Sequence, residues 1–173
     1  MVRMILLISL FILGCSEKFS LPKQENLSGK LRLDGCYYSF FPINNHQYVS
    51  IYFFYENGII YHENIPFESV EKGLQVYIDR NKDINYAKVS KKDQTIWGLY
   101  NILNDNITIE KAEPVDGLPM LKEYGKIIND TTFVLNQSKE HKVLTKYSPE
   151  YLHFKQFRSK PDSTYCLIKW KVD

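Results

Sequence analysis

The sequence lacks the short motifs by which many catalytic and metal sites are recognised. It contains no Gly-x-Ser-x-Gly elbow, no phosphate-binding loop and no dinucleotide-binding fingerprint. The four histidines form no metal-binding pair with each other, and no Cys-x-x-Cys occurs. They are His46, His62, His141 and His153. No two carboxylates are placed by the sequence in the opposed environments that a glycosidase needs. We therefore expect no enzymatic activity, no metal ion and no cofactor.

The sequence also has no large excess of positive or negative charge. The chain carries 22 basic and 20 acidic side chains, for a formal net charge of +2. Proteins that bind nucleic acid rely on a clustered positive surface. A short basic cluster at Lys88, Lys91 and Lys92 is followed directly by Asp93, which is typical of a solvated turn. The composition therefore excludes nucleic acid as an expected partner.

Apolar runs are short. The run over residues 4–13 follows Arg3 and falls short of the roughly 20 residues that a membrane-spanning helix needs. A charged start, a short apolar middle and a small residue at position 14 are typical of a secretory signal. The alternatives are an ordinary cleaved signal with a chance cysteine and an uncleaved N-terminal anchor.

The end of this run, Ile-Leu-Gly-Cys over residues 12–15, resembles the lipobox of bacterial lipoproteins. The resemblance implies that residues 1–14 are a signal peptide and that the thiol of Cys15 is acylated, so that two or three acyl chains anchor the protein. Ser16, rather than an aspartate, follows the cysteine and by the same resemblance favours the outer membrane. We expect residues 15–28 to be a flexible tether and residues 29–173 to be one domain.

Two further cysteines, Cys36 and Cys166, are left once Cys15 is acylated. The cell envelope is oxidising, so a disulfide between Cys36 and Cys166 is one alternative, and two free thiols are the other. Such a bond needs the first and last strands to be neighbours, as in a closed barrel. Alternation places Cys36 outward and Cys166 inward, so the bond would also need a bulge or an inverted face on one strand.

Aromatic residues are abundant, with 13 Tyr and 10 Phe, and they cluster with β-branched residues between turn signals. This pattern predicts a series of short strands. They are expected at 31–41, 48–55, 59–64, 97–103, 107–110, 125–128, 131–136, 151–157 and 165–172. One segment, 67–79, instead repeats its apolar residues at helical spacing, with Pro66 at its entrance, and predicts a short helix.

The first hairpin carries the candidate site. Asn57-Gly58 predicts a two-residue turn, which would place Phe53 opposite His62. Phe53, Tyr55 and His62 then share a largely apolar face, which we expect to point into the interior and to contact a ligand. The opposite face carries a set of three aromatic residues and one isoleucine that we expect on the outer surface. That group is Tyr52, Phe54, Ile59 and Tyr61.

These elements predict a mainly β fold, an antiparallel barrel or sandwich of about eight to ten strands with one short helix. The chain resembles the lipocalin-type barrel domains of bacterial lipoproteins. Gly-Cys-Tyr at 35–37 occupies the place of the family's Gly-x-Trp, and Trp-Gly-x-Tyr at 97–100 resembles its mid-barrel hairpins. The resemblance implies a lipocalin-like barrel over most of residues 31–172.

Two functions follow as hypotheses. The first is a non-catalytic barrel, anchored to the membrane through its N-terminal lipid, that binds a small apolar or amphipathic ligand in its interior. The second is an interaction or accessory module of an envelope complex, which would use the outer aromatic face or the long connection at 112–121.

Overall fold

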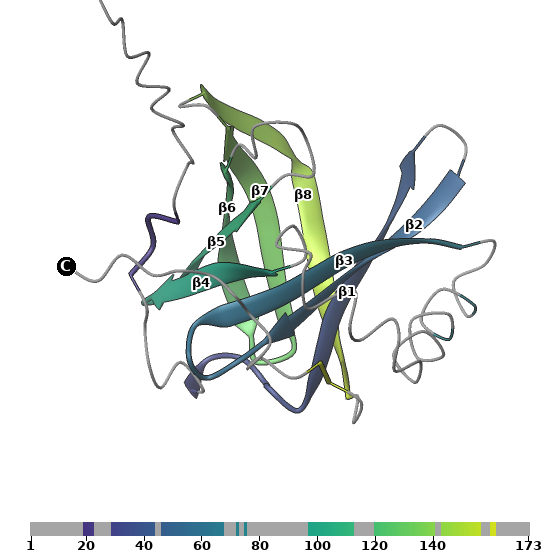
Figure 1. Ribbon diagram of the computed structural model, residues 1–173, viewed down its shortest axis with the longest axis horizontal. Coiled ribbons are helices and arrows are strands. Elements are labelled where there is room, and N and C mark those ends of the chain that lie inside the picture. The colour runs from purple at the N-terminus through teal and green to yellow at the C-terminus, as the bar shows by residue number, and fades with distance from the viewer. Residues whose placement is uncertain are drawn as a thin grey trace, which may run out of the picture.

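The computed structural model describes residues 19–22, 29–43, 46–67, 72, 75, 97–112, 120–140, 143–156 and 160–161. Within these ranges the chain forms a closed barrel of eight antiparallel strands (Figure 1). In chain order the strands are β1 (Gly35–Ile43), β2 (His46–Phe54), β3 (Ile59–Phe67), β4 (Trp97–Leu103), β5 (Asn106–Ala112), β6 (Met120–Asn129), β7 (Thr132–Glu140) and β8 (Val143–Gln156). The described residues include no helix that is long and apolar enough to span a membrane.

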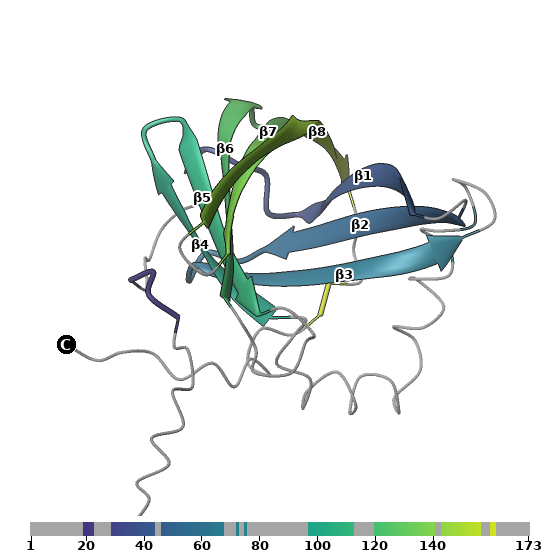
Figure 2. The ribbon, with the colours of Figure 1, turned by 90° about the horizontal axis from the view of Figure 1, so that it is seen from above.

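Each strand pairs with the next one in the chain, and β8 returns to pair with β1 from Gly35↔Gln156 to Tyr38↔His153. Seen from above, the later strands curve around to meet β1 (Figure 2). The prediction of a mainly β fold with an antiparallel barrel is confirmed, and the barrel rather than the sandwich is the form observed. Closure removes the unpaired sheet edges that an open sheet would present.

Closure depends on a close approach of β1 and β8 at Gly35. A Cβ atom there would collide with the carbonyl oxygen of Lys155 and lie 2.7 Å from Cζ of Phe154. Only glycine lets β1 and β8 come this close at the point where the barrel closes.

The β2–β3 hairpin differs from the predicted two-residue turn. Tyr55 N donates to the carbonyl of Ile59, and Gly58 takes a left-handed conformation with φ of 77°. This geometry is that of a three-residue loop, in which a glycine supplies the left-handed position. Tyr52 therefore pairs with His62, in place of the predicted pair of Phe53 with His62.

Two other predicted elements also change. β3 continues to Phe67, so Pro66 lies in a strand opposite Tyr48 and not at the entrance of a helix. Of the rest of the predicted helix, the structure describes only Lys72 and Gln75. β8 pairs with β7 on one side and with β1 on the other. The predicted strand 165–172 lies outside the described residues.

Side chains on the two faces of the sheet form two separate apolar clusters. The first draws members from all eight strands and therefore fills the lumen of the barrel. It consists of Leu31, Tyr37, Tyr52, Phe54, Ile60, Tyr100, Ile107, Ile109, Ile127, Phe133, Leu135 and Leu152. The second draws on the first four strands alone and lies on the outer face. It consists of Cys36, Val49, Ile51, Phe53, Tyr55, Ile59, Tyr61, Ile65, Trp97 and Leu99.

Part of the predicted tether lies against this outer face. Phe19 and Leu21 pack on the outer cluster. The backbone amides of Ser20 and Leu21 both donate to Oε2 of Glu110, at 2.8 Å each. Glu110 is 1% exposed, and Lys122 Nζ lies 3.6 Å from its Oε1. A buried carboxylate with these donors fixes residues 19–22 to the barrel.

Candidate functional site

The side chains that line the lumen are aromatic and aliphatic at one end of the barrel and polar toward the other. Going inward from the end where β1 starts, the lumen is first lined by rings and aliphatic chains. Phe54 lies among Tyr37, Tyr100 and Phe133, with ring centroids 5.5, 4.8 and 5.6 Å away. Edge-to-face contacts of this kind fill space with little room left between rings. We call this end the aromatic half of the lumen.

One step of two residues along the strands brings polar side chains to the same face. Ser39 follows Tyr37, His62 follows Ile60 and Lys111 follows Ile109, while Glu150 precedes Leu152. We call this region the polar half of the lumen. Its members are Ser39, Ser50, Tyr52, His62, Lys111, Glu123, Tyr147 and Glu150.

At the centre of the polar half is a buried ion pair. Lys111 Nζ lies 3.0 Å from Oε2 of Glu123, with 9% and 10% of the two side chains exposed. The hydroxyl of Tyr52 links both partners: it accepts from Lys111 at 3.2 Å and donates to Glu123 at 3.3 Å. Burial first, and then the charge of Glu123, raise the pKa of Tyr52 well above its ordinary value, so its hydroxyl keeps its proton.

His62 lies against the same tyrosine. Its ring centroid is 4.4 Å from that of Tyr52, and its Nε2 lies 3.0 Å from Oγ of Ser50. Burial, followed by the positive charge of Lys111, lowers the pKa of His62 well below 6.5. The imidazole is therefore neutral at neutral pH and adds no charge to the lumen.

Glu150 and Tyr147 complete the polar half from β8. Ser39 donates a hydrogen bond from its hydroxyl to Glu150. Burial is the main cause that raises the pKa of the Glu150 carboxyl, and the nearby Glu123 raises it further. Burial and these two carboxylates also raise the pKa of Tyr147. The Tyr147 hydroxyl is buried, and none of the described residues provides it with a hydrogen-bond partner.

The structure separates the three residues predicted to bind a ligand. His62 lies in the lumen, whereas Phe53 and Tyr55 belong to the outer cluster. The interior assignment of Phe53 and Tyr55 is wrong because β2 is buried on both faces, so no polar face marks the outside. The loop of three residues then pairs His62 with Tyr52 instead of Phe53.

The outer aromatic surface proposed for a partner protein is not present as predicted. Tyr52 and Phe54 lie in the lumen, while Ile59 and Tyr61 lie in the outer cluster. All four are buried. This group therefore does not provide an exposed apolar patch for docking.

Cys36 lies on the outer face, as alternation predicted. It is buried, and burial raises the pKa of its thiol to about 12. Cys166 and Cys15 lie outside the described residues, so both the disulfide and the lipidation stay predictions.

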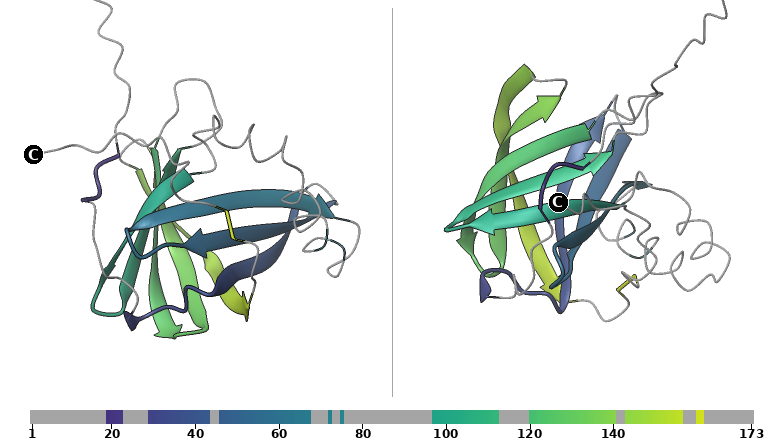
Figure 3. Two further views of the ribbon diagram at one scale, coloured as in Figure 1. Left: turned by 60° about the horizontal axis from the view of Figure 1, so that its bottom comes forward. Right: turned by 60° about the vertical axis from the view of Figure 1, so that its left-hand side comes forward.

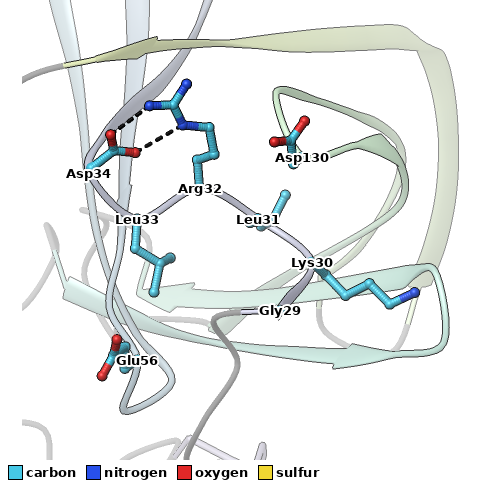
Figure 4. Close-up of a pocket in the computed structure, with 8 residues that line it drawn as sticks. All are labelled: Gly29, Lys30, Leu31, Arg32, Leu33, Asp34, Glu56 and Asp130. Carbon is cyan, nitrogen blue, oxygen red and sulfur yellow. Dashed lines mark hydrogen bonds and ion pairs between the residues drawn. The ribbon is translucent and has the colours of Figure 1, made fainter.

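The far end of the aromatic half is covered by residues 29–34, which leave a depression of about 460 Å³ on the surface (Figure 4). Leu31 points into the barrel from this segment, and Arg32 pairs with Asp34 at 2.6 Å. The backbone N–H of Arg32 donates to the hydroxyl of Tyr37, which in turn donates to the carbonyl of Asp130. These two hydrogen bonds connect residues 29–34 to the β6–β7 turn. The Arg32–Asp34 pair in its wall is exposed, and exposed ion pairs of this kind contribute little free energy.

At the other end, β1, β2 and β3 extend beyond β4 (Figure 3). β3 pairs with β4 only over Ile59–Tyr61, although it continues to Phe67. The polar half thus lies where the wall between these two strands is least complete. Among the described residues no group of three or more His, Cys, Asp or Glu side chains is placed to hold a metal ion.

No protein-family model matches the chain, no curated protein matches its sequence and no solved structure matches its fold. No catalytic family is therefore indicated by comparison, and the lumen has to be interpreted from its own chemistry.

Sequence reasoning missed most of the polar half. A signal for it does exist: Ile107, Ile109 and Lys111 alternate on one face of a strand, and Glu123, Gly125 and Ile127 do so on the next. A single charge on an otherwise apolar face marks a buried ionisable group. Lys111 and Glu123 lie just beyond the predicted strands 107–110 and 125–128, so continuing the alternation of both strands by two residues would have indicated the ion pair.

Proposed function

We propose that this protein is a lipid-anchored lipoprotein of the bacterial envelope whose barrel binds a small molecule in the polar half of its lumen. The ion pair of Lys111 and Glu123 is the observation that carries the proposal of a lumenal site. The lipobox residues that end at Cys15 carry the proposal of the anchor.

The ion pair supports binding because it is a poor way to stabilise a barrel. Apolar side chains of similar volume often replace a buried ion pair with no loss of stability, or with a gain. The aromatic half of the same lumen shows that this barrel can be filled with rings alone. Charged groups in the polar half are therefore better explained by the binding of a guest molecule than by folding.

The location of these groups changes the expected ligand. The aromatic half is filled by its own side chains, which leaves no room there for the apolar ligand suggested by the sequence. A guest in the polar half would meet hydroxyls, an imidazole and charged groups. The ligand that fits is therefore small and polar or amphipathic.

The docked segment 19–22 supports a barrel held close to the membrane. Phe19 lies four residues after Cys15, and four extended residues span at most about 14 Å. An acylated Cys15 would therefore hold the barrel near the lipid surface, without a long tether between them.

Native mass spectrometry of the protein purified from its own envelope tests the lumenal site. The wild type should carry an additional small-molecule mass, and the K111M/E123L variant should be folded and lack it. A wild type without bound mass, or a variant with the same bound mass, would contradict the proposal.

Membrane fractionation tests the anchor. C15A should leave the membrane fraction, and C36A, the matched control, should remain there. A wild type that is soluble and carries no lipid on Cys15 would contradict the proposed anchor. It would not bear on the lumenal site, which is tested separately.

A further inference from the structure

The polar half of the lumen contains more negative than positive groups. Lys111 is already paired with Glu123. Glu150 receives a hydrogen bond from Ser39, and it has no ion-pair partner in the part of the chain that the structure describes. Its carboxylate is also close enough to Glu123 for the two to repel each other. Lys111 is also near enough to Glu150 to favour its charge, so one described cation faces two carboxylates, and the polar half keeps an excess of negative charge.

A second unmatched group lies beside this carboxylate. The Tyr147 hydroxyl is buried, and no described atom accepts its proton. Tyr147 is close enough to Glu123 and Glu150 for both to raise its pKa, so it stays a neutral hydrogen-bond donor. A buried donor without an acceptor is destabilising, and a bound acceptor would remove that penalty.

We propose that the polar half of the lumen binds a small organic amine, whose ammonium group pairs with Glu150 and which offers a hydrogen-bond acceptor to Tyr147. The inference rests on the proposed lumenal binding and names the chemical class of the guest. An ammonium group supplies the charge that the network lacks, together with three donors for carboxylate oxygens. An anion would add a further negative charge beside Glu123 and Glu150.

Two features favour an organic cation over a metal ion. The described residues present no group of three or more acidic, histidine or cysteine side chains that could ligate a metal. Nζ of Lys111 already lies 5.3 Å from the centroid of the Tyr52 ring in the same region. An aromatic ring that attracts one ammonium group suits an organic amine, whose carbon skeleton can also contact the ring.

Four probes of nearly equal shape separate these contributions. They are 2-phenoxyethylamine, its neutral analogue 2-phenoxyethanol, its acidic analogue phenoxyacetate, and 3-phenylpropylamine, in which a methylene replaces the ether oxygen. Binding of each to the full-length protein in detergent is measured by calorimetry at about pH 8, where the amines are protonated and Glu150 is ionised. We expect 2-phenoxyethylamine to bind at least about tenfold more tightly than 2-phenoxyethanol, and phenoxyacetate to bind least.

Two variants assign the preference to named side chains. E150Q should reduce the advantage of the amine over the alcohol to about twofold or less, because the amide keeps the shape and loses the charge. E56Q, at the other end of the barrel, is the matched control and should keep the full advantage. Y147F should weaken 2-phenoxyethylamine and leave 3-phenylpropylamine unchanged, because only the ether can accept from the hydroxyl.

The outcomes distinguish this inference from the proposal on which it rests. If the alcohol or the acid binds as tightly as the amine, or E150Q keeps the preference, the amine assignment is overturned. Lumenal binding itself survives that result if K111M/E123L abolishes the binding. If no probe binds at about 1 mM, the amine assignment is also overturned. If, in addition, the native protein carries no bound mass, the lumenal site falls with it.

Discussion

Lys111 and Glu123 form an ion pair inside the barrel, with 3.0 Å between Nζ and Oε2. They come from neighbouring strands, since Glu123 pairs with Ile109, two residues from Lys111 on the same face of β5. Both charges are largely withdrawn from water, so each depends on the other for its stability. The lumenal chemistry of this protein is organised around that dependence.

K111M should therefore destabilise the protein by about 3–5 kcal/mol, because it leaves the charge of Glu123 buried and unpaired. The double variant K111M/E123L should return to wild-type stability or exceed it. Urea unfolding followed by tyrosine fluorescence measures both. The control is K30M, since the pair of Lys30 with Asp105 is 53% and 57% exposed and should cost less than about 1 kcal/mol. A K111M cost no larger than that of K30M would contradict the account.

His62 should make the protein sensitive to mild acid. Its native pKa lies well below 6.5, mainly because of burial, while the unfolded chain binds a proton near 6.5. Below that pH the unfolded state binds more protons than the native state, so stability falls as the pH falls. The slope should approach about 1.4 kcal/mol per pH unit for this group. H62Q should flatten the slope between about pH 6.5 and 5, whereas H153Q, at an exposed position, should not. Equal slopes in both variants would refute this assignment.

Glu150 should give stability the opposite pH dependence to that given by His62. Burial raises its native pKa above the ordinary value of 4.5, so the native state favours the protonated carboxyl. That stability is fully present below pH 4.5 and is lost as the pH rises through the native pKa. E150Q should therefore be more stable than the wild type at neutral pH, and the difference should vanish in acid. Thermal unfolding across this pH range checks it, with E56Q as control. A difference that does not change with pH would count against the buried carboxylate.

Barrel closure should be sensitive to a single methyl group at Gly35. G35A places a Cβ against the carbonyl oxygen of Lys155, so β1 and β8 must separate. A loss of about 1–3 kcal/mol is expected, together with faster amide exchange along β8. G29A is the matched control because nothing lies within 4 Å of a Cβ at Gly29. Equal stability of the two variants would show that the close approach at Gly35 is not required.

Segment 19–22 should be released by one substitution on the barrel. E110L removes the acceptor for the amides of Ser20 and Leu21, so their hydrogen exchange should accelerate by about tenfold or more. T108V, two residues away on the same face, should leave these amides protected. Unchanged protection in E110L would mean that the packing of Phe19 and Leu21 alone holds the segment.

Much of the fold was predictable from the sequence because turn chemistry is local. The predicted strands 97–103 and 107–110 are joined by a hairpin turn of two residues, and Asn104 begins it with φ of 58°, since asparagine tolerates the left-handed conformation. Asn129 and Asp130 likewise mark the β6–β7 turn. β6 and β8 begin earlier than predicted, at Met120 and Val143, because the charged residues that follow these short apolar starts interrupt the strand signal.

The candidate site was less predictable because face assignment depends on the whole barrel. Val49, Ile51 and Phe53 form the more apolar face of β2, yet they lie outside, where β1 to β4 carry a second buried cluster. The lumenal face instead contains Ser50 and Tyr52. A period of two shows that a strand has two faces, but it cannot identify the interior when both are buried.

The most direct test of the account is a high-resolution crystal structure of the protein purified from its native envelope. We expect density for a bound organic molecule in the polar half of the lumen, within hydrogen-bond distance of Glu150 and of the Tyr147 hydroxyl. A lumen that contains only water, or only the chain's own side chains, at these positions would contradict the proposed function.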